Sequence, residues 1–245
     1  MNLLLNNHLS PITSSYGFIE KETNELVDCY LDWQKEINEQ IPLSKRTEYK
    51  ASLLGGSLEQ VLLKLLPLGV QGEYRFLFIP TRSKWTAYFA NGFRGTDPSA
   101  IGYLAKRCNC RSIWIVATPF IMKKEESRGF EGALILELFG PEDTGTISLN
   151  RIRSIRLEKD IGIWSFTQDG APLPFERLER YELRNKKDKF PLEVMNKYLL
   201  ELGIDAFQER YFLPSGTKTC LVTAKTTYKI QHLSLDEAKH YYDKK

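Results

Sequence analysis

The run of residues 84–100, KWTAYFANGFRGTDPSA, is denser in side chains that could do chemistry than any other part of the chain. Its candidate ligand-binding residues are Trp85, Tyr88, Arg94, Thr96 and Asp97. A helix N-terminus carries partial positive charge and free N–H groups, so a helix beginning after Asp97 would hold an anion beside Arg94. One prediction is therefore an enzyme site, or a site for a small anionic ligand, at the Arg94–Asp97 loop.

A purely structural interpretation of the same run needs no ligand. Asn91-Gly92 is a turn-forming pair, and Asp97 followed by Pro98 is a typical helix start. The aromatic residues of the preceding strand would then face a core. This interpretation leaves Arg94 without a structural role, so Arg94 is the residue on which the binding prediction depends.

The cysteines and histidines show no metal or nucleophile signature. Cys108 and Cys110 form a C-x-C pair, but structural zinc usually takes four ligands from two paired clusters. The three histidines, His8, His232 and His240, lie near the ends of the chain. The sequence also lacks the G-x-S-x-G, H-E-x-x-H, P-loop and G-x-G-x-x-G motifs. We predict no metal, no cofactor, and reduced cysteines that serve as packing residues.

Scattered carboxylates leave an enzyme open as an alternative, because such sites carry no sequence motif. Glu137 lies in an apolar stretch, where burial would raise its pKa as in catalytic acids. We favour a half-exposed strand face on which Glu137 is solvated. Glu73 and Arg75 flank a strand start and are predicted to lie at the surface. The absence of catalytic motifs, weighed against these scattered carboxylates, favours a protein without catalytic activity.

A basic stretch at 151–159, RIRSIRLEK, contains Arg151, Arg153, Arg156 and Lys159. A nucleic-acid platform would combine these cations with Trp164 or Phe166 for base stacking. However, the net charge is only +3, from 34 basic and 31 acidic residues, whereas nucleic-acid binding calls for a concentrated basic face. A solvated strand face, or a surface for an acidic protein partner, fits this stretch better.

The proline-containing segment 169–184, DGAPLPFERLERYELR, is a candidate edge of the same surface. Tyrosine, tryptophan and arginine contribute most of the binding energy in protein interfaces. The predicted partner-binding residues are Arg151, Arg153, Phe175, Arg177, Arg180 and Tyr181. In the alternative interpretation, this segment is a loop that packs Phe175 and Tyr181 onto the sheet.

The composition is that of a folded protein without a membrane segment. The chain has 245 residues, 42% of them hydrophobic and 27% charged, with 12 Tyr, 13 Phe and 4 Trp. The first ten residues lack the basic region of a signal peptide. The longest apolar run, VLLKLLPLGV, is interrupted by Lys64 and Pro67 and is too short to span a bilayer. We expect a cytoplasmic protein.

The elements that must position these residues are helices and strands in mixed order. Apolar spacing and capping residues predict helices at 22–41, 57–66, 97–108, 190–203 and 234–245. Apolar and aromatic runs predict strands at 73–80, 84–91, 112–120, 129–140, 150–159 and 161–170, and a short one at 218–225. Residues 42–56 are predicted to be a loop, and a bulge is expected near Ser154.

Short turns between consecutive strands favour antiparallel pairing. We therefore predict an α+β fold, with a mainly antiparallel sheet of about six strands and helices packed on one face. A single domain is expected over 1–245. It comprises an N-terminal helical segment at 20–70, a sheet core at 72–170 and a C-terminal helical region at 190–245.

Two stretches together resemble a group of bacterial proteins without assigned activity. They are WTAYFANGFRGTD at 85–97 and the stretch at 164–204, which contains WSF and GAPLPFE before an amphipathic helix. The group's motifs are W-T-A-Y-F-x-N-G-x-x-G-T-D and W-x-F…G-x-P-x-x-F-E. The resemblance implies a bacterial cytoplasmic source and a binding role, and it carries over no catalytic residue.

The leading functional prediction is non-catalytic binding of a protein partner. The specific candidate is an immunity protein that neutralises a toxin domain, because such proteins are small, aromatic-rich and cytoplasmic. This candidate rests on an analogy of class and not on a motif.

Overall fold

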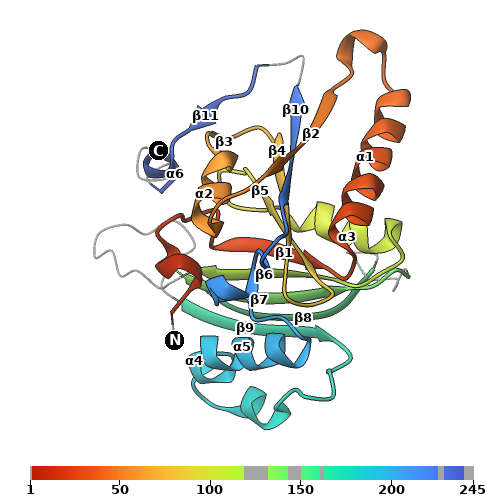
Figure 1. The fold of residues 1–245 in the computed structure, drawn as a ribbon. Coiled ribbons are helices and arrows are strands. Elements are labelled where there is room, and N and C mark those ends of the chain that lie inside the picture. The colour runs from red at the N-terminus through yellow and green to blue at the C-terminus, as the bar shows by residue number, and fades with distance from the viewer. Residues whose placement is uncertain (1, 119–131, 143–149, 161–162, 226–228, 240–245) are drawn as a thin grey trace.

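Nine antiparallel strands form one continuous sheet through the protein (Figure 1). The computed structural model describes residues 2–118, 132–142, 150–160, 163–225 and 229–239. The sheet consists of β1 (Ser15–Ile19), β2 (Glu48–Leu54), β4 (Arg75–Pro80), β5 (Thr86–Ala90), β6 (Ser112–Thr118), β7 (Gly132–Phe139), β8 (Arg151–Asp160), β9 (Ile163–Gly170) and β10 (Thr219–Lys225). Across the sheet, the order is β2-β10-β4-β5-β1-β6-β7-β8-β9. A second, two-stranded sheet pairs β3 (Leu68–Gly69) with β11 (His232–Leu233).

The helices connect these strands and cover the sheet. They are α1 (Thr23–Glu39), α2 (Leu58–Leu62), α3 (Pro98–Arg107), α4 (Lys186–Lys189), α5 (Leu192–Glu201) and α6 (Leu235–Lys239). Short 3-10 turns are η1 (Leu4–Asn7), η2 (Leu43–Lys45), η3 (Leu63–Leu65), η4 (Leu178–Glu182) and η5 (Glu209–Tyr211). The α+β prediction is confirmed. Of the predicted elements, positions 119–120, 129–131, 161 and 240–245, including His240, lie outside the described residues.

Helices pack on both faces of the sheet, so the prediction of a one-sided arrangement is wrong. Along β5, Ala87 and Phe89 join the core that α2 and α5 complete, whereas Tyr88 and Ala90 join the core under α1 and α3. Every residue of β5 is buried. A strand that is apolar on both faces indicates a covered sheet on each side.

The sheet has nine strands rather than about six, because the short strand predicted at 218–225 joins it as β10 and two further strands, β1 and β2, carry weak sequence signals. β1 lies between β5 and β6, where Gly17 pairs with Tyr88 on one side and Trp114 on the other. The glycine is required there, since a side chain at position 17 would collide with Ile101 of α3. β2 occupies part of the predicted loop at 42–56 and pairs with β10, and most of its side chains are exposed.

Several local predictions are confirmed in detail. β4 and β5 form the expected hairpin, with Phe78 opposite Tyr88. Ser57 and Gln60 form a reciprocal capping box at α2, and Asp97 accepts a hydrogen bond from the Ser99 N–H at the start of α3. The bulge in β8 lies near Ser154, as predicted. Leu138 and Phe139 of β7 pair with Arg153 and Arg151, so Ile152 is the extra residue of β8.

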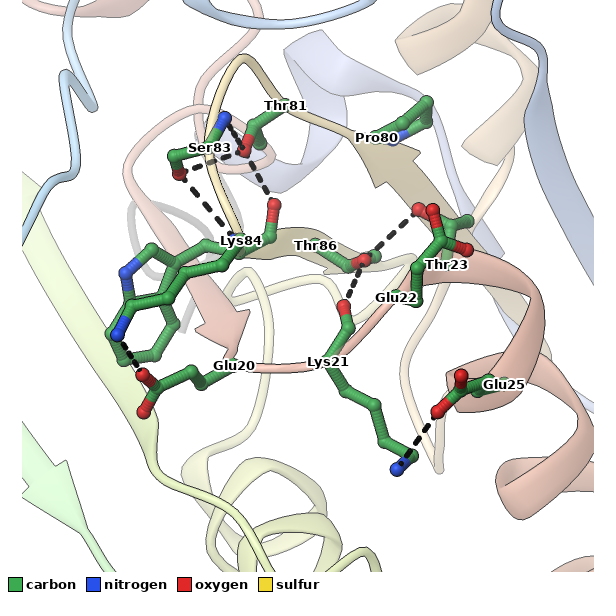
Figure 2. Close-up of a pocket in the computed structure, with 11 residues that line it drawn as sticks. Glu20, Lys21, Glu22, Thr23, Glu25, Pro80, Thr81, Ser83, Lys84 and Thr86 are labelled. Atoms are coloured by element: carbon green, nitrogen blue, oxygen red, sulfur yellow. Dashed lines mark hydrogen bonds and ion pairs between the residues drawn. The ribbon is translucent and has the colours of Figure 1, made fainter.

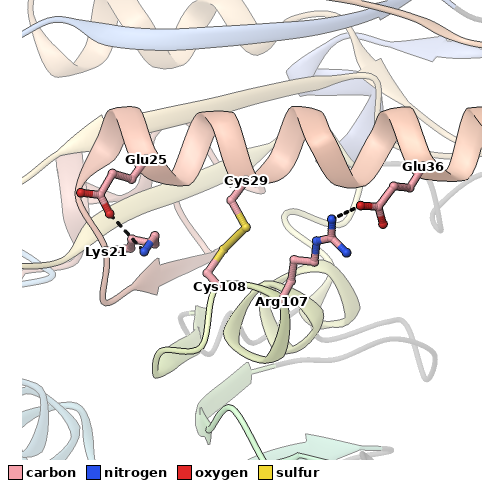
Figure 3. The surroundings of a disulfide bond; sticks show 6 residues. All are labelled: Lys21, Glu25, Cys29, Glu36, Arg107 and Cys108. Carbon is pink, nitrogen blue, oxygen red and sulfur yellow. Dashed lines mark hydrogen bonds and ion pairs between the residues drawn. A yellow bond between two sulfur atoms is a disulfide. The ribbon is translucent and has the colours of Figure 1, made fainter.

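A disulfide joins α1 to the end of α3, so the prediction of reduced thiols is wrong for two of the four cysteines. Cys29 is bonded to Cys108 across 79 positions of sequence (Figure 3). Cys110 and Cys220 are free thiols. Ion pairs between Arg107 and Glu36 and between Lys21 and Glu25 flank the bond. The C-x-C spacing gave no indication of this pairing, because the partner of Cys108 lies on another helix.

We expect loss of this cross-link to destabilise the fold. Replacing Cys29 by Ser, or adding a reductant, should lower the free energy of unfolding by about 4 kcal/mol, because a long loop in the unfolded chain is no longer closed. Urea unfolding with and without dithiothreitol measures the change. Cys110→Ser is the matched control and should keep its sensitivity to reductant. Identical transitions for the wild type in both buffers would contradict the cross-link.

Candidate functional site

The residues predicted to form one ligand site lie at opposite ends of β5. Trp85 precedes the strand, is 1% exposed, and donates its indole N–H to the Leu202 carbonyl at 2.9 Å. Tyr88 is in the middle of the strand and is fully buried on the other face of the sheet. Arg94, Thr96 and Asp97 follow the end of the strand. The structure therefore does not bring Trp85 together with the Arg94–Asp97 loop.

The Arg94–Asp97 loop is tied to the sheet by its own residues. The Thr96 hydroxyl accepts the Ala90 N–H at 2.9 Å. The Thr96 carbonyl accepts hydrogen bonds from the Ser15 hydroxyl at 2.9 Å and the Trp114 indole at 3.0 Å. Arg94 is exposed, with its guanidinium 5.0 Å from the ring centroid of Phe93. Thr96 thus has a structural role, and Arg94 faces solvent.

Carboxyl groups already occupy the N-terminus of α3, where the anion was predicted. Asp97 Oδ1 accepts the Ser99 N–H at 2.7 Å, and Glu73 Oε1 accepts the Asp97 N–H at 2.9 Å. An incoming anion would meet these acids instead of free donors. Glu73, predicted at the surface, is partly buried. No sequence signal indicates this contact, because 24 positions separate the two acids.

Burial raises the pKa of the Glu73 carboxyl to about 8, and the nearby charge of Asp97 adds to the shift. The hydrogen bond from the Asp97 N–H acts in the opposite direction but is the weaker effect. Tyr88 belongs to the same environment. Its pKa is raised well above the usual value by burial, then by Tyr30 and by the two carboxyls. Within the described residues, the buried Tyr88 hydroxyl has no hydrogen-bond partner.

A hollow of about 350 Å³ lies at the other end of β5, between the β4–β5 turn and the start of α1 (Figure 2). Glu20 at its wall accepts hydrogen bonds from Arg111 Nε at 2.6 Å and Nη2 at 3.0 Å and also pairs with Lys84. The hydrogen bond from Arg111 is the main cause of the lowered pKa of Glu20. Glu20 is therefore a paired carboxylate, as expected for a structural ion pair.

Hydroxyl groups line the same hollow, and each has a partner inside the protein. The Thr23 and Thr86 hydroxyls lie 2.9 Å apart, and Thr86 Oγ1 also donates to the Lys21 carbonyl at 2.7 Å. Ser83 bonds to Tyr211 at 2.7 Å. These contacts tie the β4–β5 turn to its neighbours, so a ligand in the hollow would have to compete with existing hydrogen bonds.

Two of the predicted partner-binding residues lie inside the protein. Arg153 and Glu176 form a bidentate ion pair with N···O distances of 2.8 and 2.6 Å, and both side chains are 0% exposed. Tyr181 is also buried and donates its hydroxyl proton to Glu176 Oε2 at 2.8 Å. These residues hold the segment after β9 against β8, because a buried charge must be paired. Arg153 and Tyr181 are therefore not available to a partner.

The other predicted partner-binding residues lie at or near the surface. Phe175 is half-buried, with its ring centroid 5.8 Å from that of Tyr198. Arg177 is exposed. Arg180 is half-buried and donates to the Asp188 carbonyl. The alternative interpretation, in which this segment is a loop that packs its aromatic residues onto the sheet, is therefore correct for Tyr181. Arg177 is accessible to another molecule.

Glu137, predicted to be solvated, is 2% exposed and lies under two arginines. Its Oε1 accepts hydrogen bonds from Arg151 Nη1 at 3.0 Å, Arg156 Nη2 at 2.8 Å and Ser154 Oγ at 3.2 Å. The two arginines share this buried carboxylate, and each also pairs with a second acid, Arg151 with Asp169 and Arg156 with Glu158. The bulge between Arg151 and Arg153, and the alternation of the strand between Arg153 and Arg156, place Arg153 on the opposite face, so the basic stretch does not form one surface.

The aromatic residues proposed for base stacking are covered by cations of α4. Lys187 Nζ lies 5.4 Å from the ring centroid of Trp164, and Lys189 Nζ lies 5.4 Å from that of Phe166. Both rings face the side of β9 against which α4 packs. This arrangement does not provide the open ring faces that bases would need.

Comparison of the chain with protein-family models, curated proteins and solved structures found no match. In the part of the chain that is described, no helix has both the length and the apolar character needed to cross a membrane. The same residues bring together no group of three or more metal-ligating side chains.

The raised pKa of Glu73 predicts that stability falls as pH rises. Between its ordinary value of 4.5 and about 8, the native state keeps a proton that the unfolded chain has lost. The free energy of unfolding should then decrease by at most about 1.4 kcal/mol per pH unit from this group. Glu73→Gln should flatten the slope between about pH 5 and pH 8 in urea unfolding. Glu182→Gln, at an exposed position, should keep it, and an unchanged slope in Glu73→Gln would refute the assignment.

The buried ion pair predicts a large loss when one partner is removed. Arg153→Met should lower the free energy of unfolding by about 3–5 kcal/mol, because Glu176 would stay buried without its counter-charge. The double variant Arg153→Met/Glu176→Leu should recover much of that loss, since no unpaired charge remains. Arg177→Met is the exposed control. Calorimetric unfolding measures all three, and a single variant as stable as the wild type would exclude a buried pair.

Proposed function

We propose that the protein acts without catalysis, by binding an acidic protein partner along the edge strand β9. This strand ends the sheet, and in the described part of the chain no strand pairs with its outer edge. Its eight residues include one charged side chain, Asp169, and no proline. Ile163 is 69% exposed. This open edge is the observation that carries the proposal.

Edge strands present unpaired N–H and C=O groups, and natural proteins usually protect them with charges, proline or a covering segment. The opposite edge, β2, carries Glu48 and Lys50 among its seven residues. β9 is therefore less protected than β2 against pairing with a strand of another molecule. An extended segment of a partner can add to such an edge through main-chain hydrogen bonds.

The surroundings of β9 favour a partner with negative charge. Helix α4 packs against β9, and residues 177–189 contain six basic residues and three acidic ones. Arg177, Arg184 and Lys186 in this segment are exposed. Complementary charge accelerates association and selects among partners.

In its specific form, the proposal is that the partner is a toxin domain and that this chain is the bacterial immunity protein that neutralises it. The resemblance of residues 85–97 and 164–204 to a bacterial protein group supports the bacterial source and the binding role. The ionisable groups described above also support a non-catalytic role, because Glu20, Glu137 and Glu176 are each neutralised by arginine.

The alternative, an enzyme or anion-binding site at the Arg94–Asp97 loop, has less support. Asp97 and Glu73 already accept the donors at the start of α3, and Thr96 is committed to the sheet. A bound anion there would have to replace the carboxyl groups of the chain itself.

Co-purification from the native host, followed by affinity measurement with the purified partner, tests the proposal. Thr167→Glu puts a negative charge on the exposed face of β9, beside Arg156, and should weaken binding by about tenfold or more. Ala51→Glu, on the exposed edge strand β2, is the matched control and should bind as the wild type does. Failure of any stoichiometric partner to co-purify would reject the protein-binding function. Equal binding by Thr167→Glu and the wild type would reject β9 as its surface.

A further inference from the structure

A shallow groove of about 520 Å³ lies where the β4–β5 turn meets η5 and the start of α2. Its walls include Ser57, Leu58, Arg82, Gln208, Arg210 and Phe212. The groove is separate from β9, since the hairpin that forms one wall is separated from β9 by β1, β6, β7 and β8 in the sheet. It is also separate from the Arg94–Asp97 loop, which follows the other end of β5.

Main-chain hydrogen bonds hold the backbone of Arg82 against the segment that follows Arg210. The Arg82 N–H donates to the Tyr211 carbonyl at 2.9 Å, and the Leu213 N–H donates to the Pro80 carbonyl at 2.9 Å. Between them, Thr81 and Phe212 form an antiparallel bridge. Arg82 Nε then donates to the Arg210 carbonyl at 2.6 Å. The position of Arg82 is therefore set by the backbone around Arg210.

Neither arginine has a counter-charge within the described residues. Arg107, Arg111 and Arg153, in contrast, are each paired with a carboxylate. No described carboxylate lies within ion-pair distance of Arg82 or Arg210, although Glu209 also lines the groove. Both arginines line the same groove, so an anion in the groove would be attracted by two cationic side chains.

The backbone at the groove also departs from an ordinary conformation. Leu213 has a φ of +52°, a left-handed conformation that is unusual for a bulky side chain. Backbone strain of this kind persists where the surrounding structure enforces it, and it is common at ligand sites. Here the bond from the Leu213 N–H to Pro80 holds the strained residue at the groove wall.

We propose that this groove binds a phosphate monoester, with the phosphoryl group between Arg82 and Arg210 and the organic part against Leu58 and Phe212. Guanidinium groups bind oxyanions through paired N–H donors, and two of them match the charge of a phosphate dianion better than that of a single carboxylate. Apolar side chains in the same groove favour an ester with an apolar or aromatic body over free phosphate.

Isothermal titration with phenyl phosphate tests this site. Arg82→Ala and Arg210→Ala should each weaken binding by about tenfold or more, since each removes one charge-assisted contact. Arg46→Ala, which changes an arginine that also donates its Nε to a main-chain carbonyl but does not line the groove, is the charge-matched control and should bind as the wild type does. Circular dichroism and thermal unfolding show whether each variant is folded. Arg82→Lys keeps the positive charge but lacks the planar guanidinium with its paired N–H donors. It gives a second, more conservative measurement of binding if Arg82→Ala is destabilised.

Three outcomes would overturn the proposal. One is no binding of phenyl phosphate by the folded wild type at millimolar concentrations. Another is binding that Arg82→Ala and Arg210→Ala leave unchanged. The third is equal affinity for benzoate, which would reject the phosphoryl group as the recognised feature. Weaker binding of inorganic phosphate than of phenyl phosphate would support the role of Leu58 and Phe212.

Discussion

The buried ion pair between Arg153 and Glu176 is the constraint on which the C-terminal half of the fold depends. Both charges are removed from water, so they are tolerable only while their geometry is kept. Tyr181 and the Leu173 N–H complete the hydrogen bonding of Glu176. The pair therefore fixes the segment after β9 against β8, and with it α4 and α5. The same constraint leaves the outer edge of β9 facing away from the core.

Charge pairing elsewhere follows the same physical logic. Glu20 holds Arg111 and Lys84 beside the β4–β5 turn, and Glu137 holds Arg151 and Arg156 on the open face of β8. In each case, a partly or fully buried carboxylate is neutralised by cations that a sequence reading would count as free surface charge. Arg82 and Arg210 line a groove in which no described carboxylate is paired with them, and this is why we propose the groove as an anion site.

The central part of the sheet is covered on both sides. This arrangement explains why the residues predicted to form one ligand site lie apart in the structure. Consecutive residues of β5 point into different cores, so Trp85 lies apart from Tyr88 and from the Arg94–Asp97 loop, whose Asp97 shares an environment with Tyr88. The disulfide between Cys29 and Cys108 locks together the helices that cover one of these faces. The surfaces that we propose for recognition, the outer edge of β9 and the groove beside the β4–β5 turn, lie outside these two cores.

Features that depend on neighbouring residues could be predicted from the amino-acid order alone. They include the capping boxes at Ser57 and Ser234, the β4–β5 hairpin and the Asp97 cap of α3, because each rests on contacts within a few positions. The folded chain was needed to show that β1 enters the sheet between β5 and β6, that Cys29 is bonded to Cys108, and that Arg153 is buried. These outcomes depend on contacts between segments distant in sequence, and hydrophobic periodicity does not specify which strand or charge becomes the partner of another.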